Sequence, residues 1–293
     1  MIGAADDRRL TRRKARYWNG AREHAWMLAP PVAFLAAFLV VPLARVVWAS
    51  VGPLGAPFAV YARVFEQGFY ARSFLYTIQT AFIVTLVCLI AAYPLAYALA
   101  NARGWTGRLM STLLLLPLWT SVVIRSYAWL ILFQRHGPVN AGLLWLHWVG
   151  QPVQILQTAA AVRIGMVHIL LPFMVLPLVA SMTRVDRTLL RAARVLGATP
   201  VRVFLRVYLR LTLPGVLAGC SLVFISALGF YITPALLGGA RNATAAMMIE
   251  QAVSVFLDWP LASALSTILL LTTIVLYLGY ARLTRGELRA LVR

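Results

Sequence analysis

Long runs of apolar residues, separated by short polar segments, dominate this chain. A helix of about 20 such residues crosses a bilayer core about 30 Å thick. Six segments meet that requirement, and we expect each of them to cross the membrane once. They are Trp26–Trp48, Phe74–Ala100, Leu109–Phe133, Thr158–Met182, Pro214–Leu237 and Leu261–Ala281. The pattern predicts an all-α polytopic membrane protein with about six transmembrane helices in one domain.

The composition supports this class. Hydrophobic residues make up 61% of the chain and the mean hydropathy is +0.81. Charged residues make up 12%, about half the share usual in soluble domains. A net charge of +19 would by itself suggest nucleic-acid binding. The arginines, however, flank the apolar segments, which is typical of a protein held in a lipid bilayer and not of one that binds nucleic acid.

The basic residues predict the orientation of the chain. One side of the membrane collects the basic tail 1–25, the arginines that follow the second and fourth spans, and the tail 282–293. The other side carries only Arg63, Arg72, Arg135 and Arg241. Because Lys and Arg accumulate on the cytoplasmic side, we expect both termini to be cytoplasmic and residues 26–281 to form the transmembrane domain.

Several classes of chemistry have no residues to support them. The only lysine is Lys14, in the N-terminal tail, so no phosphate-binding loop of the G-x-x-x-x-G-K type is present. The histidines are scattered, without the spacing of metal ligands: His24, His136, His147 and His168. The predicted spans carry no carboxylate for a proton relay. We therefore expect no catalytic residue, metal site or cofactor in this chain.

The most informative segment is the loop Arg184–Leu213, which carries seven arginines and one acid, Asp186. Its first arginines recur at helical spacing, and Gly197 to Pro200 reads as the stop of one helix and the start of the next. Two short helices joined by a turn form a rigid knob that fits a groove on a partner. The alternative is a basic helix that lies on anionic lipid headgroups.

The same loop resembles the conserved cytoplasmic loop of ABC importer permeases, on Ala192-Ala193, Gly197 and Leu213-Pro214-Gly215. That family loop usually begins Glu-Ala-Ala, and here Arg191 replaces the acid. It often has a proline where this chain has Arg210. The resemblance implies that the loop docks a separate ATPase subunit and that its later proline starts the next span. The docking residues it implies are Arg191, Ala192, Ala193, Gly197, Pro200 and Pro214.

Three further motifs resemble the spermidine/putrescine branch of that family. They are Leu116–Ser121 with Arg125–Trp129, Tyr93–Tyr97, and Thr233–Gly239. The resemblance implies a type I ABC importer permease, multi-pass in a bacterial inner membrane. It would work with two ATPase subunits, a second homologous permease subunit and a periplasmic solute-binding protein. Its function would be to move a small polar solute, polyamine-like or related, into the cytoplasm by alternating access.

Aromatic, arginine and proline residues in or near the third and fifth spans are candidates for a translocation path. Aromatic side chains near span ends also serve as interfacial anchors, and an arginine near the outer surface can extend its side chain to water. The candidates are Trp119, Arg125, Tyr127, Trp129, Tyr231 and Pro234.

Two questions stay open at the level of the sequence. A secondary transporter or channel would move a small solute without an ATPase partner, and a membrane scaffold would need no solute path. The solute itself is not fixed, because a dication favours intramembrane carboxylates and the spans have none. A neutral, zwitterionic or anionic solute is compatible with the spans, and Arg125 would suit an anion.

Overall fold

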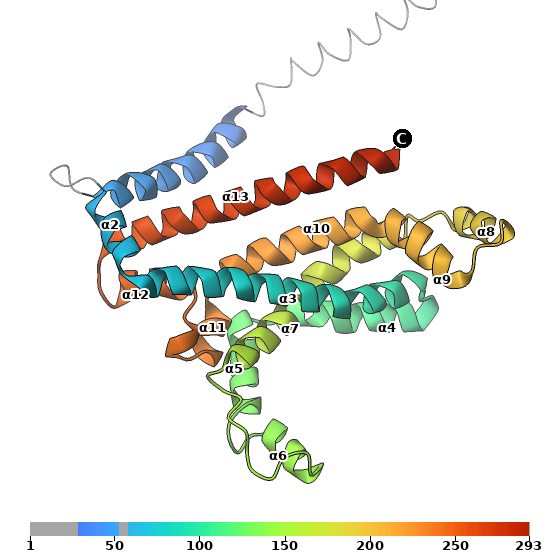
Figure 1. The fold of residues 1–293 in the computed structure, drawn as a ribbon, viewed down its shortest axis with the longest axis horizontal. Helices are drawn as coiled ribbons and strands as arrows, with labels where there is room; N and C mark the ends of the chain where they lie inside the picture. The colour runs from blue at the N-terminus through green and yellow to red at the C-terminus, as the bar shows by residue number, and fades with distance from the viewer. Residues whose placement is uncertain (1–28, 53–57, 293) are drawn as a thin grey trace, which may run out of the picture.

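The computed structural model describes the backbone of residues 29–52 and 58–292, and the fold is a bundle of helices (Figure 1). The first helices are Ala29–Val51, α2 (Ala59–Glu66), α3 (Gly68–Asn101), α4 (Gly104–Leu115), η1 (Leu116–Trp119), α5 (Val122–Leu132), α6 (Pro138–Trp145) and α7 (Ala159–Met182). They are followed by α8 (Arg187–Val195), α9 (Pro200–Val203), η2 (Phe204–Tyr208), α10 (Leu209–Leu228), α11 (Ile232–Leu237), η3 (Ala240–Asn242), α12 (Ala245–Ser254) and α13 (Trp259–Val292). The expected basic tail 1–25 and the start of the first span at Trp26 lie outside the described residues.

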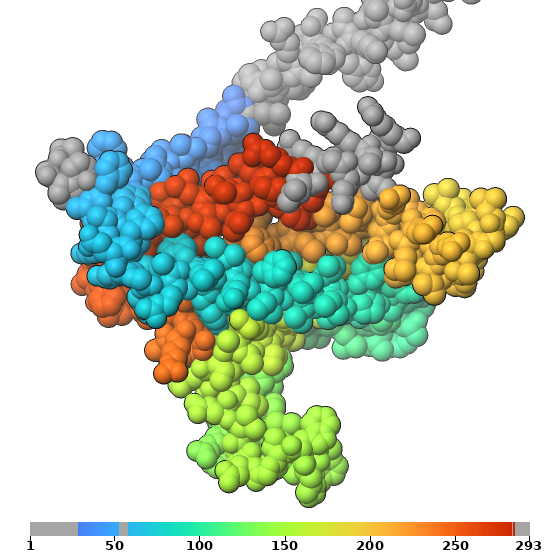
Figure 2. Space-filling model, viewed as in Figure 1, coloured from blue at the N-terminus to red at the C-terminus, as the bar shows by residue number. Residues whose placement is uncertain are grey.

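The long helices α3, α7, α10 and α13 run along the bundle (Figure 1). α8 and α9 lie at one end of the bundle and α2 and α12 at the other, while α5 and α6 project to one side. The space-filling view shows α8 at the tip of the molecule, well clear of the projecting α5 and α6 (Figure 2). The fold thus separates two regions of interest, the loop with α8 and the lateral arm with α5.

Small residues allow the central helices to pack closely. On α3 a stripe of small or medium side chains is fully buried at helical spacing: Ala81, Val84, Cys88, Ala92 and Ala96. On α10, a β-carbon at Gly215 would lie 2.8 Å from the carbonyl oxygen of Pro177 on α7, and one at Gly219 would lie 2.7 Å from the sulfur of Met174. Glycines spaced by four residues let two helices approach through their backbones, and α7 and α10 meet in this way.

Four of the six expected spans are confirmed as continuous helices. Ala29–Val51, Gly68–Asn101, Ala159–Met182 and Trp259–Arg282 are each long and apolar enough to cross a membrane. α13 continues as a helix to Val292, so the segment after the sixth span, expected as a tail from residue 282, is helical in the residues described.

The expectation of one continuous third span over Leu109–Phe133 is wrong. α4 and η1 end at Trp119, and α5 begins at Val122 at an angle of 99° to them. The break has a local cause, because Pro117 lies in the tight 3₁₀ segment η1 and cannot donate to a helical hydrogen bond. The hydroxyl of Ser121 then accepts from the amide of Val123 and starts a new helix.

The fifth span also differs from the expected Pro214–Leu237. The helix runs from Pro200 to Leu228 without interruption, so Pro214 lies inside it and does not start it. A π-helical stretch, η2, also lies within this helix, before Pro214. The helix ends at Gly229, and α11 follows as a separate short helix.

The close contact between α7 and α10 makes a testable prediction. We expect Gly215→Val to force the two helices apart, because its side chain would overlap Pro177 and Ser181, at a cost of about 1–3 kcal/mol. Thermal unfolding of the purified protein in detergent should show a lower midpoint. The matched control is Gly279→Val on α13, where a β-carbon meets nothing within 4 Å. Equal midpoints for the two variants would contradict the proposed contact.

Candidate functional site

The ends of α8 are fixed by local chemistry, and its stop at Gly197 is the one that the sequence predicts. Asp186 caps its N-terminus by accepting from the amide of Thr188 at 2.8 Å. Gly197 follows its C-terminus with φ +83°, the left-handed conformation that glycine adopts most readily. Thr199 caps the next helix, and Pro200 occupies its first position. The two helices of the loop therefore meet at a defined turn.

The second helix of the loop is not a separate short helix as expected, since it continues as α10. The loop therefore consists of α8 held between the end of α7 and the start of the helix that contains α10. The three arginines of this second helix are all exposed: Arg202, Arg206 and Arg210.

The Asp186 cap is charged at neutral pH. The hydrogen bonds from the backbone and side chain of Thr188, with a smaller contribution from Arg191, hold the pKa of Asp186 below its usual value of 3.8. A lowered pKa means that the stabilisation by this cap is complete above pH 3.8 and is lost as the pH falls through the lower pKa of the folded protein. The start of α8 is therefore insensitive to pH in the physiological range.

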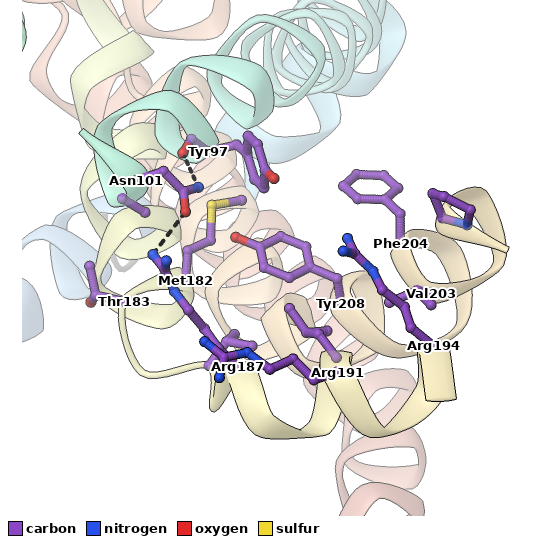
Figure 3. A pocket seen from close by; sticks show the side chains of 14 residues that line it. Tyr97, Asn101, Met182, Thr183, Arg187, Arg191, Arg194, Val203, Phe204 and Tyr208 are labelled. Carbon is purple, nitrogen blue, oxygen red and sulfur yellow. Dashed lines mark hydrogen bonds between the residues drawn. The ribbon is translucent and has the colours of Figure 1, made fainter. Parts of the chain in front are cut away.

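α8 has two faces of different chemistry. Arg187, Arg191 and Arg194 line a pocket between α8 and the ends of the long helices (Figure 3). The side chains of Leu189, Val195 and Leu196 are exposed, the last two at 87% of their surface. A soluble surface seldom leaves several neighbouring aliphatic side chains uncovered unless a partner covers them.

The pocket has a volume of about 530 Å³. Tyr97 and Asn101 contribute from the end of α3, and Phe204 and Tyr208 from η2 (Figure 3). The Nη2 atom of Arg187 donates to the side-chain oxygen of Asn101 at 3.0 Å, and so ties α8 to α3. The rings of Phe204 and Tyr208 stack at 5.7 Å. The pocket is thus basic on the α8 side and aromatic on the side of the long helices.

The expected docking residues do not share one surface. Ala192 and Gly197 are exposed, Ala193 is half-buried, and a β-carbon at Gly197 would meet nothing within 4 Å. In the sequence, this group lies between and directly after the exposed aliphatic residues Leu189, Val195 and Leu196.

The other expected docking residues lie elsewhere. Arg191 and Pro200 line the basic pocket. Pro214 lies inside α10, next to the glycine that contacts α7. Helical spacing alone does not say which face of α8 turns toward the bundle, which is why the sequence did not separate the two groups.

Three of the expected path residues come together where α5 meets α11 and α7. Arg125 on α5 is buried, with 9% of its surface exposed, and Pro234 on α11 is buried nearby. Trp129, one turn along α5, donates from Nε1 to Nδ1 of His168 on α7 at 3.1 Å. Nε and Nη1 of Arg125 have no hydrogen-bond partner among the described residues. A buried guanidinium with free donors is suited to an anionic or carbonyl group from outside this chain.

The other three expected path residues are not drawn into this junction. Trp119 is exposed over 91% of its surface, and Tyr127 and Tyr231 are also exposed. Trp119 immediately precedes the break in the third span and Tyr231 immediately precedes α11. Both aromatic residues therefore lie at helix ends, where aromatic anchors are common.

The junction also contains residues that the sequence did not single out. Ser126 on α5 and Thr233 on α11 are fully buried, and their hydroxyl oxygens are 2.8 Å apart in a hydrogen bond. His168 completes the junction from α7. Ser126 and Thr233 both lie inside the motifs that resemble the spermidine/putrescine branch, and this could have indicated them. Small polar residues on apolar helices are typical of helix contacts in membranes.

The structure is a bundle of membrane-crossing helices that presents a short amphipathic helix at one end. Comparison with known proteins identifies its class. Residues 89–287 match the family model described as "Binding-protein-dependent transport system inner membrane component". The chain is 39% identical over 225 residues to the spermidine/putrescine transport system permease protein PotB of Escherichia coli K12, covering 77% of this chain and 82% of that protein.

Two further matches are more distant. The molybdenum transport system permease protein ModB of Mycobacterium bovis is 31% identical over 206 residues, covering 70% of this chain and 76% of that protein. A chain in the crystal structure of a bacterial alginate ABC transporter, in complex with an alginate-bound periplasmic protein, matches with a TM-score of 0.75 at 18% identity. That match covers 92% of this chain and 98% of the other.

The chain therefore belongs to the family of binding-protein-dependent transport system inner membrane components. It is an ABC importer permease and a multi-pass protein of the inner membrane. The expectations of family, fold and importer role from the sequence are confirmed.

The buried hydroxyl pair at the junction makes a second prediction. We expect Thr233→Val to destabilise the protein by about 1–3 kcal/mol, because it leaves the Ser126 hydroxyl buried without a partner. The double variant Ser126→Ala/Thr233→Val should recover part of that loss. Thermal unfolding of the four proteins of this cycle measures the coupling. If the destabilisations of the two single variants simply added up in the double variant, the predicted coupling between the two hydroxyl groups would be contradicted.

Proposed function

We propose that this chain forms the solute path of its importer together with a second homologous permease subunit, while two separate ATPase subunits dock on the α8 loops. A periplasmic binding protein delivers the solute. The observation that carries the proposal is the exposed aliphatic face of α8, around Leu189, Val195 and Leu196, on a helix that joins α7 directly to α10. ATP hydrolysis then belongs to the partner subunits, and this chain is not itself an enzyme.

The connectivity of α8 supports its role in coupling. Four residues separate α7 from α8, and four separate α8 from α9. The hydrogen bond between Arg187 and Asn101 adds a tie to α3. A partner that moves α8 therefore moves the ends of three packed helices. Because packed cores shift between discrete arrangements, such a movement can tilt the spans between two states of access.

The orientation follows from the distribution of charge. We place the α8 end of the bundle in the cytoplasm with both termini, and the α2 and α12 end in the periplasm. The arginines of the loop lie at the α8 end, and positively charged loops favour the cytoplasmic side. The ATPase subunits then meet α8, and the binding protein meets the opposite end.

For the solute, a polyamine is the first candidate, because a 39% identical relative is named as a spermidine/putrescine permease. The 31% identical relative is named for molybdenum transport, so related permeases serve different solutes. The described spans contain no carboxylate that would attract a dication. Selection of a polyamine would then come from the binding protein and the second permease subunit. The path in this chain would pass the junction of Arg125, Trp129 and Pro234.

Reconstitution tests the proposed function. We expect proteoliposomes that contain this chain, its second permease subunit and the ATPase to take up solute only when ATP and the loaded binding protein are both present. The control is the same vesicles with a non-hydrolysable ATP analogue. Uptake by this chain alone, without ATP, would overturn the proposal and make it a secondary transporter or channel.

A substitution at Gly197 tests the docking surface. We expect Gly197→Trp to insert normally into the membrane and to lose uptake, because its side chain enters the open space beside the exposed face of α8. Its φ of +83° also strains any bulky residue. Gly197→Asn is the control for strain, since Asn tolerates this conformation, and it should keep most of the uptake. Normal uptake and normal recovery of the ATPase with Gly197→Trp would remove this turn from the mechanism.

A further inference from the structure

The pocket behind α8 concentrates positive charge and has no acidic residue in the lining that the structure describes. Arg187, Arg191 and Arg194 line it, and none of the described residues that line it is acidic. Asp186, which caps α8, accepts from the amide of Thr188 and attracts Arg191 weakly, but it does not line the pocket. Within the described chain the one ion pair joins Arg63 to Asp258, which lie near α2 and the start of α13, away from α8.

Only part of this charge is satisfied by neutral groups. Arg187 donates to the side-chain oxygen of Asn101. Arg191 and Arg194 have no hydrogen-bond acceptor in the described part of the chain. Guanidinium groups bind phosphate oxygens through paired, charge-assisted hydrogen bonds. Three of them around a space of about 530 Å³ therefore suit one phosphate group with its substituents.

The position of the pocket indicates where that phosphate comes from. The walls opposite α8 are the C-terminal ends of α3 and α7 and the start of the α10 helix, with the rings of Tyr97, Phe204 and Tyr208. These are the ends of membrane-spanning helices, so in the orientation proposed above the pocket would lie close to the level of the lipid headgroups. Aromatic rings prefer that level, and the cytoplasmic leaflet carries anionic lipid.

We propose that this pocket binds the phosphate of an anionic phospholipid of the cytoplasmic leaflet, and that the bound headgroup holds α8 against the ends of α3, α7 and α10. The exposed aliphatic side chains of Leu189, Val195 and Leu196 do not line the pocket and stay free for a protein partner. The proposal rests on the orientation proposed above. It assigns the two faces of α8 to two ligands, lipid on the arginine side and protein on the aliphatic side.

Binding to the purified full-length chain tests the site without any partner subunit. We would titrate the protein in neutral detergent with dihexanoyl phosphatidylglycerol and measure bound lipid by native mass spectrometry. The variant Arg187→Gln/Arg194→Gln should bind at least tenfold more weakly than the unaltered protein. The matched control Arg202→Gln/Arg206→Gln removes two exposed arginines of the same loop that do not line the pocket. It should bind within twofold of the unaltered protein.

Further measurements distinguish an anionic lipid from a soluble phosphate and from a general effect of positive charge. Dihexanoyl phosphatidylcholine should bind weakly, and inorganic phosphate at millimolar concentration should not displace phosphatidylglycerol. Displacement of phosphatidylglycerol by inorganic phosphate would show that the site prefers a soluble phosphate to a lipid, and it would overturn the proposal. Equal losses in the two arginine variants would also overturn it, since general charge would then explain binding. Asn101→Ala keeps all three arginines and should still bind the lipid. If Asn101→Ala also lost lipid binding, a disturbed fold would explain the weaker binding of the arginine variant, and the proposal would be overturned.

The assembled importer gives an independent check. The Arg187→Gln/Arg194→Gln variant should still recover the ATPase subunit from membranes. In vesicles of phosphatidylglycerol and phosphatidylcholine, the solute-stimulated ATP hydrolysis of the unaltered protein should rise with the phosphatidylglycerol fraction, and that of the variant should not. Failure to recover the ATPase would assign these arginines to protein docking and overturn the lipid site. If Gly197→Trp did not affect uptake, only the proposed docking function of the loop would be contradicted, and the lipid site would not be.

Discussion

The contact between α7 and α10 is the interaction on which the rest of this structure depends. Lipid tails are as apolar as the side chains of the helices, so association must come from close van der Waals contact and not from exclusion of water. Gly215 and Gly219 provide that contact by letting the backbone of α10 approach Pro177 and Met174 on α7. Because α8 connects these two helices, its position at the tip of the bundle is set by their packing.

The lateral arm shows a second constraint of the bilayer, which is that irregular backbone must be satisfied by protein. The third span breaks at Pro117 and turns through 99°. Its continuation, α5, is fixed to α11 by the hydrogen bond between Ser126 and Thr233 and to α7 by Trp129 and His168. Non-helical segments at membrane depth persist only when they are buried in this way or line a cavity. The same junction holds Arg125, whose Nε and Nη1 have no partner among the described residues. A polar group from outside the chain could therefore bind at a point where the helices are held rigidly.

The sequence predicts some of these features and misses others for identifiable reasons. Apolar length predicts the membrane spans, and Gly197 and Pro200 predict the turn between the loop helices, because these are local properties. The break before α5 and the passage of α10 through Pro214 were missed, because counting apolar residues cannot distinguish a proline that ends a helix from one that is tolerated inside it. The face that α8 turns toward the bundle depends on tertiary contacts such as that of Arg187 with Asn101.

Arg191 replaces the acid that usually begins the family loop, and in the structure it lines the pocket behind α8. An acid at this position, as the family loop usually has, would lie beside Arg187 and Arg194 and neutralise charge inside the chain. Arginine instead gives the pocket a third cation, and none of the described residues that line it is acidic. Because the side chain faces the pocket and not the aliphatic surface of α8, the exchange alters the space behind α8 more than the surface offered to a protein partner. The docking helix can therefore keep its partner while its attachment to the membrane end of the bundle changes.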